Sequence, residues 1–149
     1  MTVLLAIDPG TTQSGFVVFD GQRVIESGVH QNEEVLRLIA ASQERRITSL
    51  AIEMIASYGM AVGREVFETC VWVGRFQQAW HSPASVRLVY RKDVKSYLCH
   101  SMKAKDANIR QALIDKIGGN CVFGHTHRAQ SNVVRRISTG IIGSWNPGC

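Results

Sequence analysis

Residues 3–10, with the sequence VLLAIDPG, are the stretch that decides the fold. Five apolar residues, two of them β-branched, run without interruption to Asp8, and Pro9 and Gly10 follow directly. A short continuous apolar run is typical of a buried strand, and Pro and Gly are the strongest signals of a turn. The stretch therefore predicts a buried strand that ends with a carboxylate at the entrance to a turn.

The segments that follow first repeat the strand pattern and then alternate it with helical patterns. Residues 15–19 predict a second strand, closed by the hairpin signal Asp20-Gly21, and residues 23–29 predict a third. The later elements are a helix over about 32–42 that Asn32 caps, a strand over 49–53 that ends at Glu53, a helix over about 64–80, a strand over 86–90, and two helices over 92–100 and 106–117.

This order of elements predicts an α/β fold in which helices flank a mixed sheet. The buried side of the long helix is predicted by the apolar repeat of Val66, Phe67, Cys70, Val73 and Phe76. The pattern changes near residue 118, because residues 120–149 contain no acidic side chain and no long helical repeat. We therefore divide the chain into a main domain over residues 1–117 and an atypical tail over 118–149, which we interpret as a fused fragment.

Length and composition exclude several classes of protein. A chain of 149 residues fits one main domain, and 45% hydrophobic against 19% charged residues excludes a disordered chain. The apolar runs are far shorter than the roughly 18 residues that a membrane span needs, and no signal peptide is recognisable. Four cysteines without a CxxC pair are typical of free thiols. We expect a soluble, intracellular protein.

Positive charge is concentrated in the second part of the chain. Residues 1–60 carry four basic and seven acidic side chains, and residues 61–149 carry thirteen and five, within a net charge of +5. Such a region is typical of a protein that binds a polyanion, for example nucleic acid. Eight basic residues lie between positions 87 and 116: Arg87, Arg91, Lys92, Lys95, Lys103, Lys105, Arg110 and Lys116. On one face they would follow a phosphate backbone, whereas on two ordinary amphipathic helices they would only be solvated.

Two carboxylates stand at predicted strand ends, where open α/β sheets bind their ligands. Asp8 ends the first strand and Glu53 the fourth. If these strands are parallel neighbours, both side chains project from the same end of the sheet, and their repulsion favours a cation between them. Oxygen ligands select a hard metal such as Mg²⁺ or Mn²⁺, and two such ions can support phosphodiester hydrolysis. The alternative is structural, with Asp8 as a turn residue and Glu53 exposed to solvent.

Four stretches resemble the RuvC-like Holliday-junction resolvases of the ribonuclease H-like nuclease superfamily. They are residues 6–15, AIDPGTTQSG, similar to the opening motif; 51–54, AIEM, similar to the second motif; 62–69, VGREVFET, similar to the phage-type branch; and 103–113, KAKDANIRQAL, similar to the basic segment and helix before the last motif. The resemblance covers about residues 1–117, and the motifs follow the family's order.

The resemblance implies a five-stranded sheet, a homodimer, and cutting of branched DNA with Mg²⁺ or Mn²⁺ as the cofactor. It implies that Asp8 and Glu53 are the catalytic metal ligands, and that the protein acts in the cytoplasm of a bacterial host cell. It also favours contacts with the DNA backbone for Arg91, Lys92, Lys95, Lys103, Lys105 and Arg110.

The sequence departs from the family pattern in two places. The resolvases end with a helix that supplies further metal ligands, but this chain has no acidic residue beyond Asp115, and Asp106 and Asp115 fall on the preceding predicted helix. Some members carry a junction-stacking aromatic three residues after the Glu, where this chain has Ala56, with Tyr58 nearby. The predicted metal site is therefore incomplete.

The tail has a resemblance of its own. Residues 122–128, VFGHTHR, and 145–149, WNPGC, resemble the C-terminal end of calcineurin-like metallophosphoesterases. This implies a metal-ligand role for His125 and His127, but the earlier motifs of that family are absent, so a loop that merely contains histidines is the alternative. A zinc site formed by these histidines with Cys121 and Cys149 is a further alternative, although the spacing matches no familiar pattern.

Four functions are consistent with the sequence. The first is a metal-dependent, structure-selective endonuclease that acts on Holliday junctions or branched DNA. The second is a branched-DNA-binding module whose truncated active site does not cut. The third is a metallophosphoesterase-like fragment, and the fourth is a fusion without function. A comparison of DNA cleavage with DNA binding distinguishes the first function from the second.

Overall fold

The computed structural model describes residues 2–57, 59–117, 122–124, 136–137, 140–141 and 143–145. The chain forms two compact units, Met1–Arg91 and Lys92–Cys149. The boundary that the sequence predicts near residue 118 borders residues outside the described ranges, so it stays a prediction.

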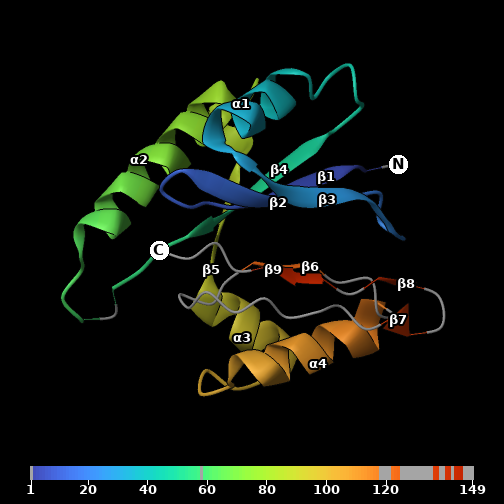
Figure 1. Cartoon of the computed structure of the whole chain (residues 1–149), viewed down its shortest axis with the longest axis vertical. Helices are drawn as coiled ribbons and strands as arrows, with labels where there is room; N and C mark the ends of the chain where they lie inside the picture. Colours follow the sequence, from blue (N-terminus) through green and yellow to red (C-terminus); the bar gives the residue numbers. More distant parts are fainter. Residues whose placement is uncertain are drawn as a thin grey trace. The chain divides into compact units, whose positions relative to one another are not determined.

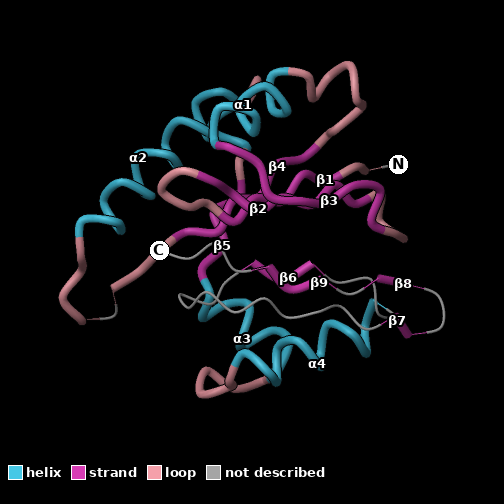
Figure 2. Tube along the Cα trace, in the orientation of Figure 1, coloured by secondary structure: helices cyan, strands magenta, loops and turns pink. Residues whose placement is uncertain are grey.

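The first unit is built on a mixed five-stranded sheet (Figure 2). β1 and β2 are antiparallel, as are β2 and β3, whereas β4 lies parallel to β1 and β5 parallel to β4. The strands are β1 (Leu4–Asp8), β2 (Gln13–Phe19), β3 (Val24–Gln31), β4 (Ser49–Met54) and β5 (Arg87–Tyr90), in the spatial order β3-β2-β1-β4-β5. Short turns join the antiparallel strands. The parallel strands are joined by longer segments that contain a helix, because the chain must cross back to the other end of the sheet before it can run parallel. The predicted α/β class with a mixed five-stranded sheet is confirmed.

Two helices, α1 (Asn32–Ala40) and α2 (Arg64–Ala79), cover one face of this sheet (Figure 1), and a short 3-10 turn, η1 (Pro83–Ser85), leads into β5. Successive side chains of a strand point to opposite faces, so alternate residues of β1, β2 and β4 point toward the helices. The core includes Leu5, Ile7, Phe16, Val18, Val35, Ile39, Leu50, Ile52, Val73 and Phe76. Burial of these apolar side chains determines which face of each strand points inward, and therefore the strand register.

The buried side of α2 contains Val73 and Phe76 as predicted, with Val66 and Cys70 half-buried, but it does not contain Phe67. Thr69, Val73 and Phe76 pack inward, and Trp80 continues this side beyond the helix end, whereas Phe67 is 63% exposed. An α-helix turns by about 100° per residue, so Phe67 is rotated by about 120° from Val73 and cannot share its side. The sequence pattern was misleading because apolar residues near the start of α2 extend beyond the buried stripe.

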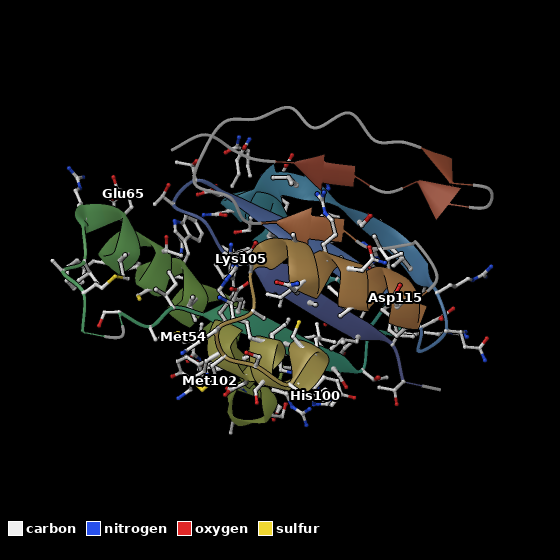
Figure 3. The ribbon with its side chains drawn as sticks, turned by 90° about the horizontal axis from the view of Figure 1, so that it is seen from below. Met54, Glu65, His100, Met102, Lys105 and Asp115 are labelled. Carbon is white, nitrogen blue, oxygen red and sulfur yellow. The ribbon has the colours of Figure 1, made fainter. Side chains whose placement is uncertain are left out.

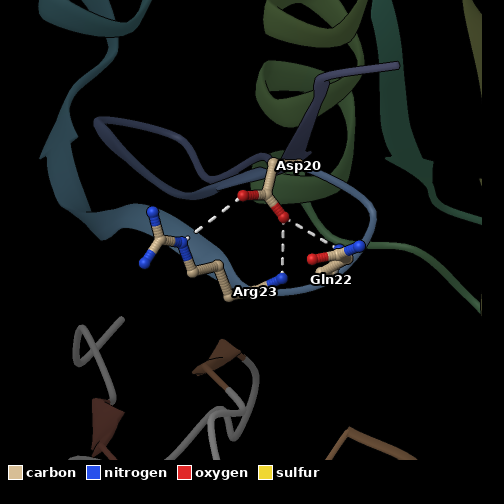
Figure 4. A network of polar contacts seen from close by, with 3 residues as sticks. All are labelled: Asp20, Gln22 and Arg23. Atoms are coloured by element: carbon tan, nitrogen blue, oxygen red, sulfur yellow. Dashed lines mark hydrogen bonds and ion pairs between the residues drawn. The ribbon is translucent and has the colours of Figure 1, made fainter. Parts of the chain in front are cut away.

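The predicted Asp20-Gly21 hairpin joins β2 to β3 (Figure 4). Asp20 Oδ1 accepts hydrogen bonds from the backbone N–H groups of Gln22 and Arg23, both at 2.8 Å, and Arg23 Nε lies 3.5 Å from Asp20 Oδ2. Gly21 has a φ of +94°, which glycine adopts without a steric penalty. The backbone hydrogen bond from Arg23, followed by the one from Gln22, lowers the pKa of Asp20.

This turn predicts a loss of stability in acid. Because the pKa of Asp20 is lower in the folded protein, the stabilisation by its carboxylate is present above the unfolded value of 3.8 and is lost as the pH falls through the folded value. We expect the melting temperature of the wild type to fall more steeply in this acidic range than that of Asp20→Asn. Thermal melts followed by circular dichroism measure the slopes, and Glu44→Gln, at an exposed carboxylate, should follow the wild type. Equal slopes for the wild type and Asp20→Asn would contradict the prediction.

The second unit contains the remaining two predicted helices, α3 (Arg91–Cys99), whose first residue still belongs to the first unit, and α4 (Asp106–Ile117). Figure 3 shows Lys105 at the start of α4 and Asp115 near its end. The Lys105 N–H donates to Asn108 Oδ1 at 3.0 Å, and Gln111 Nε2 donates to Asp115 Oδ1 at 2.8 Å. These bonds fix the start of the helix and stabilise its exposed side.

After α4, the residues that the structure describes form short strands and no further helix. The strands are β6 (Val122–Gly124), which pairs in parallel with β9 (Gly143–Trp145), and β7 (Arg136–Ile137), which pairs antiparallel with β8 (Gly140–Ile141). The last helix of the resolvases is therefore not found in the described part of the chain. None of the helices described is both long and apolar enough to cross a membrane.

Candidate active site

The parallel register of β1 and β4 places Asp8 beside Glu53. Ile7 is paired with Ile52, so the next residue of each strand occupies a neighbouring position at the carboxyl end of the sheet. Ile7 and Ile52 point into the core beneath α1 and α2, and the alternation of a strand turns both acidic side chains to the opposite face. The two carboxylates therefore lie together at one end of the sheet, in the arrangement that the sequence predicts.

A third charged residue reaches this pair from the adjacent parallel strand. Glu53 is paired with Val89 of β5, and Arg91 follows β5 directly as the first residue of α3. Arg91 Nη1 lies 3.7 Å from Glu53 Oε1, and the two side chains are 29% and 30% exposed. Three adjacent parallel strands thus bring two carboxylates and one guanidinium to the carboxyl edge of the sheet, where α/β proteins bind their ligands.

The pKa of Asp8 is raised from its ordinary value of 3.8 to about 8. Burial makes the largest contribution and the negative charge of Glu53 the next, while the positive charge of Arg91 acts in the opposite direction. Without a further cation, Asp8 therefore holds a proton near neutral pH. A divalent cation would favour the charged form, because its attraction offsets the cost of holding two carboxylates together in a partly buried place.

The donor atoms of the pair fit a hard divalent metal. Mg²⁺ prefers oxygen ligands, keeps several waters, and commonly uses one or two carboxylates together with substrate phosphates. Within the described ranges, no group of three or more His, Cys, Asp and Glu side chains comes together. The ligands that the sequence suggests in the tail, His125 and His127 with Cys121 and Cys149, lie outside the described residues, so their roles stay predictions.

Comparison with known proteins identifies the fold. No protein-family model matches the chain, and no curated protein matches it. The structure of T. thermophilus RuvC in complex with a Holliday junction substrate is similar, with a TM-score of 0.65 and 18% identity, over 79% of this chain and 81% of that chain. A second structure of Thermus thermophilus RuvC has a TM-score of 0.60 and 18% identity, over 78% of this chain and 81% of that one.

The chain has a RuvC-like fold. This is the ribonuclease H-like architecture that the sequence motifs predict, and its sheet is the mixed five-stranded sheet described above. At 18% identity the likeness shows the fold alone, and the roles of Asp8 and Glu53 rest on the geometry of their own side chains.

Within this RuvC-like fold, two buried polar residues were not anticipated from the sequence. They lie next to the turn over residues 9–12 that follows Asp8, here called the Asp8 turn. Ser14 of β2 is 1% exposed and Asn32, the first residue of α1, is 0% exposed. Their side chains bond to each other and to the backbone of Gly10. One signal was present in the sequence, since Ser14 takes an inward position of β2 that apolar side chains otherwise fill.

The predicted role of Asn32 as the cap of α1 is wrong. Gln31 takes the cap position, and its N–H donates to Glu34 Oε2 at 3.2 Å. Asn32 lies one residue further into the helix, and its side chain reaches the turn after β1 instead. The physical reason is that a buried polar partner on a distant segment competes with local capping for the same amide group.

The six residues predicted to contact DNA are divided between the two units. Arg91 stands beside Glu53 at the end of the first unit. In the second unit, Lys92 is exposed and Lys95 half-buried on α3, Lys103 and Lys105 are exposed before α4, and Arg110 is half-buried on α4. Their contacts with DNA stay predictions. Tyr58, the aromatic residue near Glu53 in the sequence, lies outside the described residues.

The raised pKa of Asp8 predicts that the metal-free protein loses stability as the pH rises. Folded Asp8 keeps its proton up to about pH 8, whereas in the unfolded chain it ionises near 3.8. The folded state binds the extra proton between these values, so the free energy of unfolding falls as the pH rises through this window. Urea unfolding in EDTA, at one pH near each end of the window, measures the fall. Asp8→Asn should remove this fall in the free energy of unfolding, whereas Asp93→Asn, at an exposed carboxylate, should keep it. A fall that remains in Asp8→Asn would show that a group other than Asp8 causes it.

Proposed function

We propose that this protein is a structure-selective endonuclease that uses Mg²⁺ or Mn²⁺ to cut Holliday junctions or other branched DNA in the cytoplasm of a bacterial host cell. The observation that carries the proposal is the pairing of Asp8 with Glu53 at the carboxyl ends of adjacent parallel strands. The RuvC-like fold supports it, because one of the similar structures is a RuvC in complex with a Holliday junction substrate.

Each charged residue of the site has its own task in this proposal. Asp8 and Glu53 hold the metal through their carboxylate oxygens. When bound, the metal supplies Lewis-acid chemistry, by which a phosphodiester is polarised and a water molecule is made more acidic. Arg91 donates hydrogen bonds to phosphate oxygens of the DNA, a task for which the planar guanidinium is suited. Its approach to Glu53 supports a place for that phosphate next to the carboxylates.

Basic residues of the second unit hold the DNA backbone in this proposal. They are Lys92, Lys95, Lys103, Lys105 and Arg110. Each phosphate that a lysine or arginine neutralises releases counterions, so binding of the junction weakens steeply as the salt concentration rises.

A homodimer is the proposed state of the enzyme. Phe67 and Val71, one turn apart on α2, are 63% and 62% exposed. Exposed apolar side chains that adjoin on one side of a helix are typical of a surface that a partner covers. A second copy of this chain is the partner that we propose.

A second candidate function is a branched-DNA-binding module that does not cut. The observation that favours it is the absence of a third metal-ligating side chain beside Asp8 and Glu53 among the residues that the structure describes. Such a module binds junctions through the same basic residues, and its two carboxylates hold a metal too weakly for hydrolysis.

The deciding experiment incubates the protein with a labelled four-way junction in Mg²⁺, Mn²⁺, Ca²⁺ or EDTA. Binding is measured by gel shift, and cleavage is measured on a denaturing gel from the same samples. Cleavage in Mg²⁺ or Mn²⁺ that disappears in EDTA, and is weaker on a linear duplex of the same sequence, supports the nuclease. Tight binding without cleavage in either metal overturns the nuclease and supports the binding module. Equal binding of junction and duplex without cleavage of either overturns both.

A further inference from the structure

Ser14 and Asn32 form a closed ring of hydrogen bonds with Gly10, two residues after Asp8. The Gly10 N–H donates to Ser14 Oγ at 3.3 Å, Ser14 Oγ donates to Asn32 Oδ1 at 2.6 Å, and Asn32 Nδ2 donates back to the Gly10 carbonyl at 3.0 Å. The Asn32 backbone N–H also donates to the Thr12 carbonyl at 2.9 Å. The start of α1 is thereby bonded to positions 10, 12 and 14 of the turn from β1 into β2.

This ring is buried, and it is not needed to begin the helix. Ser14 and Asn32 are enclosed by the protein, and burial of their polar groups is tolerated because each has a bonded partner in the ring. Gly10 is half-buried, but loss of Ser14 or Asn32 leaves the buried side chain of the other without one of its partners, which is costly. Gln31 and Glu34 already serve the helix start, so the Asn32 side chain acts on the turn.

The turn that the ring holds also sets the position of Asp8. The ring contains two residues close to Asp8: Gly10, which follows Asp8 by two positions, and Ser14, which adjoins Gly15, the cross-strand partner of Asp8. The turn is tight at Gly10, because a Cβ there would lie 2.3 Å from the Gln13 carbonyl oxygen. Glu53 belongs to β4 and does not move with this turn, so a shift of the turn changes the separation of the two carboxylates.

We propose that Ser14 and Asn32 are positioning residues, which hold the Asp8 turn so that the Asp8 and Glu53 carboxylates can share one divalent metal ion. The metal-binding part of this proposal rests on the proposed function above. Neither side chain touches the reacting atoms, and both act through the backbone of the turn. Mg²⁺ demands nearly ideal octahedral geometry, so a small displacement of one carboxylate lowers affinity, as loss of an orienting group does in other metal sites.

The test compares Ser14→Ala and Asn32→Leu with a matched control, Thr69→Val. Asn32→Leu keeps the shape of the side chain without its hydrogen bonds. Thr69 is also buried, and its hydroxyl donates to the Glu65 carbonyl at 2.8 Å within α2, so its loss removes a buried hydroxyl without touching the turn. Three experiments are made on the full chain: Mn²⁺ affinity is measured by electron paramagnetic resonance without DNA, amide hydrogen exchange is measured over residues 8–15, and the kinetics of junction cleavage give kcat and KM.

We expect both variants to bind Mn²⁺ about tenfold more weakly than the wild type, in the range found for other orienting groups of metal sites. The kcat for junction cleavage should fall by a similar factor with KM for the junction unchanged, and exchange over residues 8–15 should be faster. Thr69→Val should lose stability but keep wild-type Mn²⁺ affinity and wild-type exchange in this segment. Wild-type Mn²⁺ affinity and exchange in both ring variants would overturn the proposal.

Two further controls keep the outcome decisive. If the ring variants do not fold, Asn32→Asp replaces them: it keeps the acceptor for Ser14, loses the donor to Gly10, and should show the same weaker Mn²⁺ binding, whereas wild-type binding overturns the proposal. If the wild type itself shows no Mn²⁺ binding that Asp8→Asn abolishes, the proposed function fails. Hydrogen exchange then decides alone, since faster exchange in the ring variants supports the holding of the turn and unchanged exchange overturns it.

Discussion

Asp8→Asn is expected to lower the rate of junction cleavage by a factor of about a thousand or more, without loss of the fold or of junction binding. The amide has the size of the carboxylate but no charge, so the metal loses one of the two charged ligands that Asp8 and Glu53 provide. The substitution also removes the repulsion that, together with burial, raises the pKa of Asp8 to about 8. The metal-free variant should therefore be at least as stable as the wild type near neutral pH.

Single-turnover cleavage with excess protein measures this effect, because it separates the chemical step from product release. Glu53→Gln should show a loss of similar size, since the parallel register makes the two carboxylates equivalent neighbours. Asp93→Asn, at an exposed carboxylate of α3, should cut at the wild-type rate. An Asp8→Asn protein that retains more than about a tenth of the wild-type rate would show that Asp8 is not an essential ligand.

Gly10→Ala is expected to lower the free energy of unfolding by about 3 kcal/mol or more, because a side chain there has no space. The added Cβ would lie 2.3 Å from the backbone carbonyl oxygen of Gln13, and backbone cannot move aside as the end of a flexible side chain can. The turn could accept the methyl group only by breaking its bonds to Ser14 and Asn32. The loss is measured by urea unfolding at equilibrium.

Gly74→Ala is the matched control for this prediction. Gly74 lies in the middle of α2, exposed, and a Cβ there would meet nothing within 4 Å. Alanine is a better helix former than glycine, so this variant should be more stable than the wild type by up to about 1 kcal/mol. If Gly10→Ala is as stable as Gly74→Ala, the turn after Asp8 is not held as tightly as the geometry indicates.

The candidate site could be anticipated from the sequence in part, because two local patterns coincide with two strand ends. The apolar run before Asp8 and the one before Glu53 each predicted a buried strand that ends in a carboxylate, and both strands lie where they were expected. The adjacency of the two residues was conditional on parallel pairing of the strands, which the structure confirms.

Other features of the structure could not be anticipated, for different reasons. Asparagine commonly caps helices, but the side chain of Asn32 bonds to Ser14 and Gly10, which come close to it only in the folded protein. Phe67 continues an apolar pattern that, read along the chain, does not show which part of the helix surface meets the sheet. In the sequence, Arg91 is one of several basic residues, and nothing distinguishes it from the others. Its proximity to Glu53 depends on the pairing of β5 with β4.

For residues 1–117 the sequence by itself determined the α-helices and the strands, their order, and the carboxylates at or next to the ends of β1 and β4, because apolar spacing and turn residues act over a few neighbouring positions. Tertiary structure alone decided which parallel strands are neighbours, in which register, and which polar side chains are buried together. Asp8 meets Glu53, and Ser14 meets Asn32, only after the chain has folded. Such contacts depend on how the whole apolar core is packed, and no short segment of the sequence contains that information.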